Sequence, residues 1–271
     1  MEPLDRQDFL VTAVDAARRA GEIIMANLGG LSQQDIASKE TSDFVTRVDR
    51  ESEQAIVETI SRRFPDHSVL AEESLRDNET VGYRWIIDPL DGTTNFIHTY
   101  PVFSVSIALQ HGKDVVLGVV YDPARDELFT VERQRGALLN GTAVKVSETA
   151  DPREGLITTG FPFRRREMID RYLILFRNVF LQVSDLRRAG SAALDLAYLA
   201  CGRCDGFFEI GLSPWDVAAG SLLIEEAGGI ITDFGGGRQY LSTGNIVAGN
   251  RSLHPILLSE VRSVFRGILD E

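Results

Sequence analysis

Changes in hydrophobic periodicity constrain the fold of this chain more than any other feature. Residues 5–28 carry apolar residues at alternating steps of four and three, which predicts an amphipathic helix. A second helix is predicted over 47–64, because Pro65 stops it. From 102 to 132 the period falls to two, which predicts neighbouring β-strands joined by short turns.

The second half of the chain alternates between strand and helix patterns. We predict, in order, a strand at 156–158, helices at 167–181 and 191–201, a strand at 205–210, a helix at 216–227, a strand at 229–233 and a helix at 252–267. The sequence has no biased linker and no repeat. The predicted class is therefore α/β (α+β), with an N-terminal α+β lobe at 1–148 and a C-terminal α/β lobe at 149–271 that share one interface.

Composition places the chain among ordinary globular proteins. Of its 271 residues 44% are hydrophobic and 25% charged, with no apolar run near the ~20 residues that span a bilayer. The first residues do not resemble a signal peptide. Cys201 and Cys204 form a lone C-x-x-C without a second pair for zinc, so we interpret them as reduced thiols in the core. These features favour the cytoplasm and no membrane contact.

The net charge of −12 argues against broad nucleic-acid binding, which needs a basic face. It also creates a difficulty for a phosphorylated substrate, since carboxylates repel phosphate. A divalent metal would invert the local field. An acidic protein that handles phosphate should therefore gather acid at a metal site.

The stretch 85–96, WIIDPLDGTTNF, carries the most specific chemistry. An apolar run leads into Asp88, so this carboxylate is expected at the C-terminal end of a strand, where α/β folds bind ligands. We expect Pro89 to bend the chain and return Asp91 beside Asp88. The N–H groups that follow Gly92 would then face an anion. The competing interpretation is a simple turn, because Asp, Pro, Gly and Thr all favour turns.

Spacing excludes three other motifs. An EF-hand loop starting at Asp88 would need a Glu where Thr99 stands. No G-x-x-x-x-G-K-[ST] loop occurs in the chain. The segment 88–90 lacks the D-x-D of haloacid-dehalogenase phosphatases. Elsewhere, Glu72 and Asp216 also follow apolar runs, although taken singly they suit an exposed loop and a helix N-cap.

Together these blocks resemble the signatures of the inositol monophosphatase family. The matching blocks are AEES at 71–74, WIIDPLDGTTNF at 85–96 and WDVAAG at 215–220, with further likeness at 43–49 and 190–193. The likeness extends over nearly the whole chain. The family often has Gly where this chain has Ala71, a difference that removes no ligand.

The resemblance implies a layered αβαβα sandwich of the inositol monophosphatase and fructose-1,6-bisphosphatase type, with two or three Mg²⁺ ions between the lobes. Glu72, Asp88 and the carbonyl of Leu90 would hold one ion. Asp88, Asp91 and Asp216 would hold a second, and a third would be held weakly by Glu72 and water. Such oxygen ligands suit magnesium.

The resemblance also implies hydrolysis of a phosphate monoester by metal-activated water. Glu72 and Thr93 would orient and deprotonate the water, and Asp49 is grouped with these catalytic residues. The implied substrate-binding residues are Asp91, Gly92, Thr93, Gly190, Ser191, Ala192 and Glu209, with Lys39 as a further candidate near the third ion. Inositol 1-phosphate is the expected substrate, with inhibition by lithium.

Two alternatives stay open at this point. The same fold and mechanism would also serve fructose 1,6-bisphosphate, histidinol phosphate, a nucleotide 3′-phosphate or NADP. A regulatory or binding protein could retain the fold, although its intact acidic residues count against this as a sole role. The resemblance suggests a homodimer, whose small phosphorylated metabolite is its main partner. The basic patch Arg164–Arg166 is interpreted as a solvated turn before a helix, rather than as a contact for a partner or a second phosphate.

Overall fold

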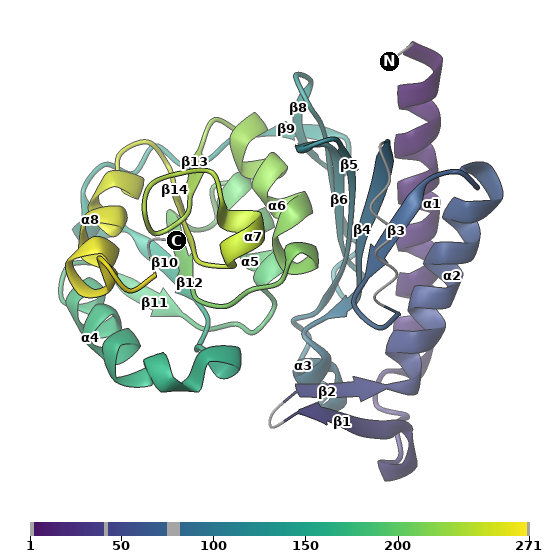
Figure 1. Ribbon diagram of the computed structural model, residues 1–271, viewed down its shortest axis with the longest axis horizontal. Helices are drawn as coiled ribbons and strands as arrows, with labels where there is room; N and C mark the ends of the chain where they lie inside the picture. Colours follow the sequence, from purple (N-terminus) through teal and green to yellow (C-terminus); the bar gives the residue numbers. More distant parts are fainter. Residues whose placement is uncertain (1–2, 41–42, 75–81, 270–271) are drawn as a thin grey trace.

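Five layers of secondary structure form the molecule. The structure is a computed structural model that describes the backbone of residues 3–40, 43–74 and 82–269 and the side chains of 8–37, 44–74 and 82–269. Its layers follow the order helices, sheet, helices, sheet, helices (Figure 1). This is the αβαβα sandwich that the family resemblance implies, with mixed helices and sheets. Over the described residues, no helix is long and apolar enough to cross a membrane.

The helices are α1 (Pro3–Asn27), α2 (Arg47–Arg63), α3 (Thr93–Ile97), α4 (Ile169–Phe180), α5 (Ala192–Ala200), α6 (Pro214–Glu226), α7 (Tyr240–Thr243) and α8 (His254–Phe265). Short 3₁₀ helices are η1 (Gln33–Asp35), η2 (Pro152–Glu154) and η3 (Phe163–Met168). The strands are β1 (Ile36–Glu40), β2 (Asp43–Thr46), β3 (Ser68–Ala71), β4 (Tyr83–Asp91), β5 (Ser104–His111), β6 (Asp114–Asp122), β7 (Glu127–Glu132), β8 (Gly136–Leu139), β9 (Thr142–Val144), β10 (Leu156–Thr159), β11 (Asp185–Arg187), β12 (Gly206–Glu209), β13 (Ile230–Thr232) and β14 (Ile246–Gly249).

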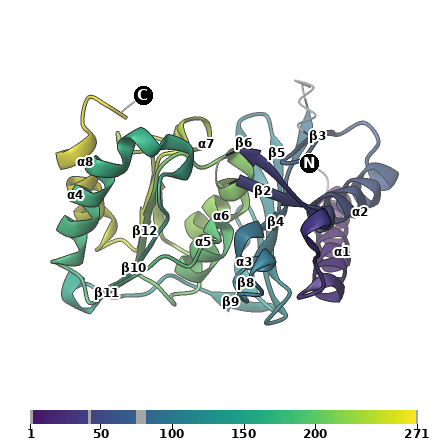
Figure 2. The ribbon, with the colours of Figure 1, turned by 90° about the horizontal axis from the view of Figure 1, so that it is seen from below.

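The first sheet runs in the order β3-β4-β5-β6-β7-β8-β9 and is buried on both faces at its centre. The pair β3 and β4 is parallel, and every later pair in this sheet is antiparallel. Because strand side chains alternate between faces, Trp85 and Ile87 pack with α1 and α2, whereas Ile86 faces the middle helices. Figure 2 shows α1 and α2 together on the outer side of this sheet.

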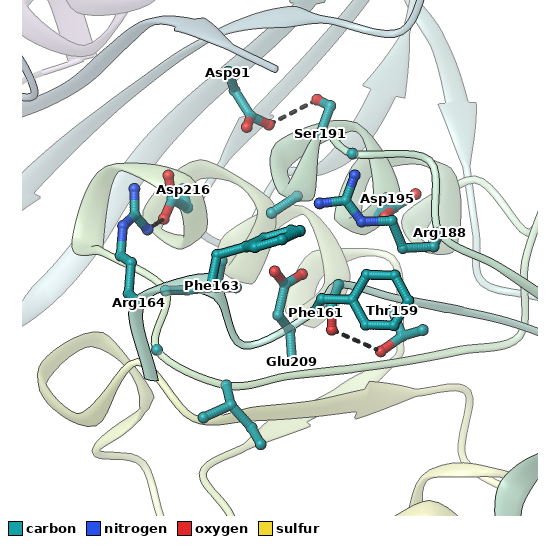
Figure 3. A pocket seen from close by; sticks show the side chains of 16 residues that line it. Asp91, Thr159, Phe161, Phe163, Arg164, Arg188, Ser191, Asp195, Glu209 and Asp216 are labelled. Atoms are coloured by element: carbon teal, nitrogen blue, oxygen red, sulfur yellow. Dashed lines mark hydrogen bonds and ion pairs between the residues drawn. The ribbon is translucent and has the colours of Figure 1, made fainter. Parts of the chain in front are cut away.

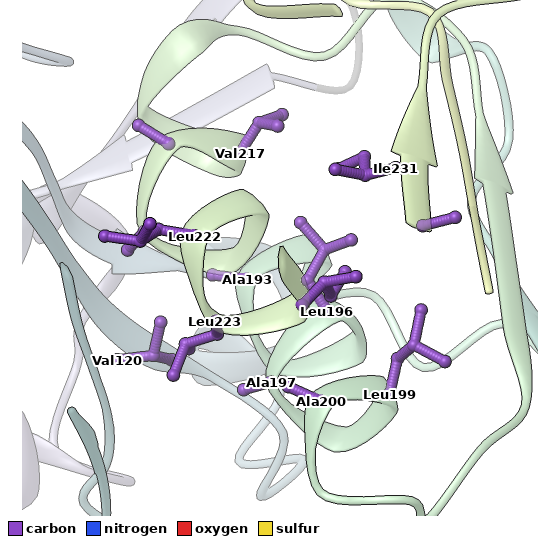
Figure 4. Close-up of a cluster of buried hydrophobic side chains, with 14 of the residues drawn as sticks. Val120, Ala193, Leu196, Ala197, Leu199, Ala200, Val217, Leu222, Leu223 and Ile231 are labelled. Carbon is purple, nitrogen blue, oxygen red and sulfur yellow. The ribbon is translucent and has the colours of Figure 1, made fainter. Parts of the chain in front are cut away.

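The middle layer consists of α5 and α6. Buried residues surround α6 on all sides, as expected for a helix placed between two sheets. Leu196 and Leu199 of α5 belong to the same apolar cluster as Leu222 and Leu223 of α6, Val120 of the first sheet and Ile231 of the second (Figure 4). This layer therefore joins the two sheets through one continuous apolar core.

The second sheet has the order β11-β10-β12-β14-β13. Strands β11, β10 and β12 are parallel, and β14 is antiparallel to both of its neighbours. Helices α4 and α8 cover its outer face, where Tyr172, Leu257 and Phe265 enter the core. The first sheet ends at Val144 and the second begins at Leu156, on either side of the lobe boundary that the sequence predicts.

The predicted helices and strands are present with small shifts at their ends. The structure also contains short elements that were not predicted. The sequence analysis did not include the β1–β2 hairpin, the β8–β9 hairpin, β11 or β14, because segments this short carry little periodic signal. Helix α6 begins at Pro214 with Ser213 as its N-cap, so Asp216 occupies the third helical position rather than the N-cap.

We predict that the buried His254 destabilises the fold in mild acid. Its side chain is 4% exposed, and burial lowers its pKa to about 4. Since an unfolded histidine titrates near pH 6.5, the unfolded state binds more protons between these values, and stability falls as the pH drops. The loss reaches up to about 3 kcal/mol. Urea unfolding at pH 7 and pH 4.5 would measure it, and His254→Asn should flatten the difference. An equal pH dependence in both proteins would contradict this account.

Candidate active site

A bulge in β4 places Asp88 and Asp91 on the same side of the sheet. Residues three apart in a regular strand point to opposite faces. Here Asp88 pairs with Ser106 and Asp91 with Ser104, so β4 carries one extra residue in the bulge. The bulge contains Pro89, which has no N–H to give to a ladder. The two carboxylates therefore meet by a bulge rather than by the simple bend that the sequence suggests.

Asp88, Asp91 and Asp216 form a carboxylate cluster. One oxygen of each lies within 4.8 Å of the others, although Asp216 comes from α6 and the other two from β4. Burial raises the pKa of Asp88 well above its ordinary value, and the charges of Glu72, Asp91 and Asp216 raise it further. Burial, followed by the charge of Asp216, raises the pKa of Asp91 to about 7. Such a cluster is costly without a cation, so its donor set fits a divalent metal with oxygen ligands.

Asp91 is held from the C-terminal lobe. Its Oδ2 accepts hydrogen bonds from the Ser191 hydroxyl at 2.7 Å and from the Ala193 backbone N–H at 2.8 Å (Figure 3). Ser191 is the N-cap of α5, so Asp91 adds a carboxylate to that helix terminus. The sequence analysis predicts substrate contacts at Gly190, Ser191 and Ala192. All three residues line the cavity described below, and the Ser191 side chain is hydrogen-bonded to Asp91.

The turn after Asp91 needs a glycine. Gly92 has φ 96° and is the N-cap of α3. A Cβ on this residue would lie 2.9 Å from the carbonyl oxygen of Val102, closer than real contacts allow. Asn95 fastens the turn by donating to Val102 at 2.7 Å and to Ala189 at 2.9 Å. The N–H groups that follow Gly92 therefore lie at the start of α3, and the turn is tied to both lobes.

Thr93 and Asp49 are connected behind this turn. The Thr93 hydroxyl lies 2.9 Å from Asp49 Oδ1 and 3.1 Å from the carbonyl oxygen of Leu90. Asp49 is fully buried, and its other oxygen accepts from the N–H and hydroxyl of Thr46 in the capping box of α2. Asp49, which the sequence analysis groups with the catalytic residues, is therefore linked to the site through the Thr93 hydroxyl.

Glu72 reaches the same site from β3. Its backbone N–H donates to Ile87 at 3.2 Å, which continues the pairing of β3 with β4 beyond Ala71. Glu72 lines a cavity of about 350 Å³ together with Asp88, Leu90 and Thr93. Lys39 lies within β1, and its side chain falls outside the described side chains.

A second cavity of about 170 Å³ adjoins the first, and the two share Asp91, Asp216, Phe163, Arg164, Arg188 and Gly190. In Figure 3, Asp91 and Asp216 lie on one side, Glu209 on the other, and the Phe163 ring between them. Burial, followed by the charge of Asp216, raises the pKa of Glu209 to about 8. Glu209 therefore keeps its proton to a higher pH than an exposed glutamate does.

Several cavity residues escaped the sequence analysis. Arg188 stacks its guanidinium 5.1 Å from the ring centre of Phe163, and Asp195 is a buried carboxylate beside Glu209. Burial raises the pKa of Asp195 well above its usual range. One signal was available, because Asp195 is the single charged residue of the apolar segment 192–200. The basic patch Arg164–Arg166 was misinterpreted in part, since Arg164 turns into the site and pairs with Asp216 at 2.9 Å.

The C-x-x-C pair lies apart from both cavities among the described residues. Both thiols are free, and burial raises the pKa of each, which makes them poor nucleophiles. We predict that replacing Cys201 and Cys204 together by alanine leaves the turnover number nearly unchanged and costs about 1–2 kcal/mol of stability. Steady-state phosphate release and urea unfolding would check this. A severe loss of turnover in a folded double variant would assign the thiols a chemical role.

The fold and the site together define a class of protein: an αβαβα sandwich with a buried carboxylate cluster where its two lobes meet. The model of the inositol monophosphatase family matches residues 5–266, and the chain belongs to this family. The chain is 47% identical over 255 residues to Nus factor SuhB of Escherichia coli, covering 94% of this chain and 96% of that protein.

Two solved structures show the same architecture. The extragenic suppressor protein suhB from Bartonella henselae superposes with a TM-score of 0.91 at 41% identity, covering 96% of this chain and 100% of that one. The inositol monophosphatase from Anabaena gives 0.86 at 43% identity, covering 96% and 97%. Solved structures with this fold thus include a protein named suhB and a protein named inositol monophosphatase.

Proposed function

We propose that the protein is a magnesium-dependent phosphatase that hydrolyses a small phosphate monoester, with inositol 1-phosphate as the expected substrate. The main observation in support is the cluster of Asp88, Asp91 and Asp216. One oxygen of each lies within 4.8 Å of the others, and burial raises the pKa of Asp88 and Asp91. A divalent cation relieves this repulsion, and membership of the inositol monophosphatase family supports the same reading.

The donor set suits two or three magnesium ions. We propose that Glu72, Asp88 and the Leu90 carbonyl hold one ion, and that Asp88, Asp91 and Asp216 hold another. Glu72 also lines the 350 Å³ cavity, where it can contact a weaker third ion. When bound, magnesium lowers the pKa of water and offsets the charge of a phosphate group.

The chain itself positions and activates the water. Glu72 is the proposed general base, because it lines the cavity beside Thr93. The Thr93 hydroxyl donates a hydrogen bond to Asp49 over an oxygen–oxygen distance of 2.9 Å, so the Thr93 oxygen is left as an acceptor that can orient the water. The backbone N–H groups of Gly92 and Thr93 stand at the start of α3, where they can donate to phosphate oxygens. This arrangement uses no protein nucleophile.

The second cavity is the proposed place of the leaving group. The Glu209 carboxyl group lines this cavity, where its oxygens can form hydrogen bonds with the hydroxyl groups of a substrate. Gly190, Ser191 and Ala192 form one wall, so the substrate would lie between this wall and Glu209. Lys39 keeps its proposed place near the third ion, on the strength of the family resemblance alone.

A substrate panel tests the proposal. Phosphate release would be measured with magnesium titrated and lithium added, using inositol 1-phosphate, glycerol 2-phosphate, fructose 1,6-bisphosphate, histidinol phosphate, adenosine 3′,5′-bisphosphate and NADP. We expect magnesium-dependent turnover with the largest kcat/KM for inositol 1-phosphate and inhibition by lithium. A preference for another compound of the panel would support the proposed mechanism and would contradict inositol 1-phosphate as the substrate. No release from any of them would contradict the proposed enzyme.

The relatives named Nus factor SuhB favour a second candidate, a binding role beside catalysis. The test is whether this chain replaces SuhB in an Escherichia coli strain that lacks it, as wild type and as the Asp91→Asn variant. Replacement by both would support a binding role that is independent of turnover. Replacement by the wild type alone would tie the effect to catalysis.

We also propose that the protein forms a homodimer in the cytoplasm. Helix α4 exposes Leu173 at 49%, Ile174 at 53% and Phe180 at 57%, followed by Leu181 at 64%. An apolar face of this kind favours contact with another chain. Sedimentation at micromolar concentration would give the mass, and a monomer would contradict the proposal.

A further inference from the structure

Arg164 brings a positive charge into the carboxylate cluster. It lies on η3, and its Nη1 is 2.9 Å from Asp216 Oδ2. The Asp216 side chain is only 6% exposed, and the same oxygen accepts the Ser213 N–H at 2.7 Å. Arg164 also lines both cavities, and Figure 3 shows its side chain directed at Asp216. It is therefore a half-exposed cation in contact with a nearly buried carboxylate of the proposed metal site.

The neighbouring arginine makes a different contact. Arg165 pairs with Glu167 two residues later, at 2.6 Å, and both side chains are solvent-exposed. Two consecutive arginines of η3, which is kinked at Arg165, thus make separate contacts. The Arg165 pair stays on the surface, and the Arg164 pair reaches the carboxylate cluster. Surface pairs contribute little, whereas a contact with a buried carboxylate acts through a lower effective dielectric.

The charge of Arg164 extends beyond its direct partner. Arg164 lines the same cavity as Asp91 and Glu209, so its positive charge lies near both carboxyl groups. A guanidinium at this position does part of what a bound cation would do, since it neutralises negative charge at the Asp91–Asp216 end of the cluster. It also repels any second cation that approaches the same oxygens.

We propose that Arg164 is a built-in cation that competes with the divalent metal for Asp216 and keeps metal affinity weak at the Asp91–Asp216 end of the site. The inference rests on the proposed metal centre and adds a residue that sets its affinity. In the metal-free protein Arg164 stabilises the cluster, and metal binding has to overcome this pairing. Arg164 is a positioning residue in this account, because it acts on the metal through Asp216.

Calorimetric titration of Mg²⁺ without substrate tests the inference directly. The wild type would be compared with Arg164→Gln and with Arg165→Gln, which removes the same charge from the same 3₁₀ helix away from the cluster. We expect Arg164→Gln to bind its weakest resolved ion about tenfold more tightly, as expected for removing a half-exposed repulsive charge close to the ion. Arg165→Gln should match the wild type, and Arg164→Lys, which keeps the charge, should lie near it.

A second readout separates this role from a structural one. Without metal, Arg164→Gln should unfold at a lower temperature than the wild type, and saturating magnesium should raise its unfolding temperature by more than that of the wild type. If Arg164→Gln does not fold, Arg164→Met keeps the apolar stem of the side chain and repeats the comparison.

The outcomes are distinguishable. Equal or weaker magnesium binding by a folded Arg164→Gln protein would overturn the role of Arg164 while leaving the metal centre in place. Equal tightening by Arg164→Gln and Arg165→Gln would also overturn it, because general surface charge would then explain the effect. Binding of no magnesium by any of the proteins would overturn the metal centre of the proposed function and the inference together.

Discussion

Asp91→Asn is expected to reduce turnover by on the order of 10³-fold or more while leaving the fold intact. The substitution removes one negative charge from the cluster of Asp88, Asp91 and Asp216, and so weakens the proposed metal site. An asparagine oxygen can still accept the hydrogen bonds from Ser191 and Ala193, so the tie to α5 is retained. Phosphate release at saturating magnesium measures the effect.

Stability provides an independent check on the same variant. The pKa of Asp91 is raised to about 7, above its unfolded value near 3.9. The native state therefore binds the extra proton between these values, and the wild type loses stability as the pH rises through them. Metal-free Asp91→Asn should be more stable than the metal-free wild type at pH 8. The exposed Asp114→Asn on β6 is a control for both readouts. Full activity of Asp91→Asn at saturating magnesium would refute the ligand role.

Gly118→Val is expected to destabilise the protein and to disturb the metal site from a distance. Gly118 lies in β6, where an added Cβ would be 3.0 Å from the Cα of Ala219 and 3.1 Å from a methyl group of Val131. Ala219 belongs to α6, whose first turn carries Asp216. A larger side chain would push α6 away from the sheet that carries Asp88 and Asp91. Overpacking of this kind costs about 1–3 kcal/mol.

The accompanying loss of function distinguishes this prediction from a general loss of stability. Gly118→Val should bind magnesium more weakly and turn over more slowly at temperatures where it remains folded. Gly30→Ala is the control, because its added methyl meets backbone oxygen at 3.4 Å and lies far along the chain from α6. Urea unfolding and magnesium titration would be compared for both variants. A destabilised Gly118→Val protein with wild-type magnesium affinity would show that the packing of α6 against the sheet does not determine the geometry of the metal site.

Periodicity predicted the long helices and the period-two strands, because these segments carry strong signals. The order of the layers was implied by the family resemblance. Short strands such as β14 could not be predicted, since four buried residues fit a strand or part of a helix equally well. The sequence analysis predicted correctly that Asp88 and Asp91 lie close together, but it attributed this to a bend at Pro89 and missed the bulge. Pro89 does not simply turn the chain, because the strand continues through it as a bulge.

The candidate site was predictable only where its residues belong to a motif. Asp216 joins Asp88 from a segment more than a hundred positions away, and the family resemblance, rather than spacing, linked them. Arg164 and Phe163 belong to no such motif. Their place in the cavity depends on tertiary contacts such as the pairing of Arg164 with Asp216, which local propensity does not encode. Residues of this kind are the ones that sequence reasoning treats as ordinary surface.

The location of bound metal tests the central claim most directly. Mn²⁺ has oxygen-ligand chemistry close to that of magnesium, and its anomalous scattering would place each ion in crystals of the protein. We predict an ion in contact with Asp88, Asp91 and Asp216 and a second one at Glu72, Asp88 and the Leu90 carbonyl. Manganese found elsewhere in the crystal, with none at Asp88, would contradict the proposed metal-dependent phosphatase.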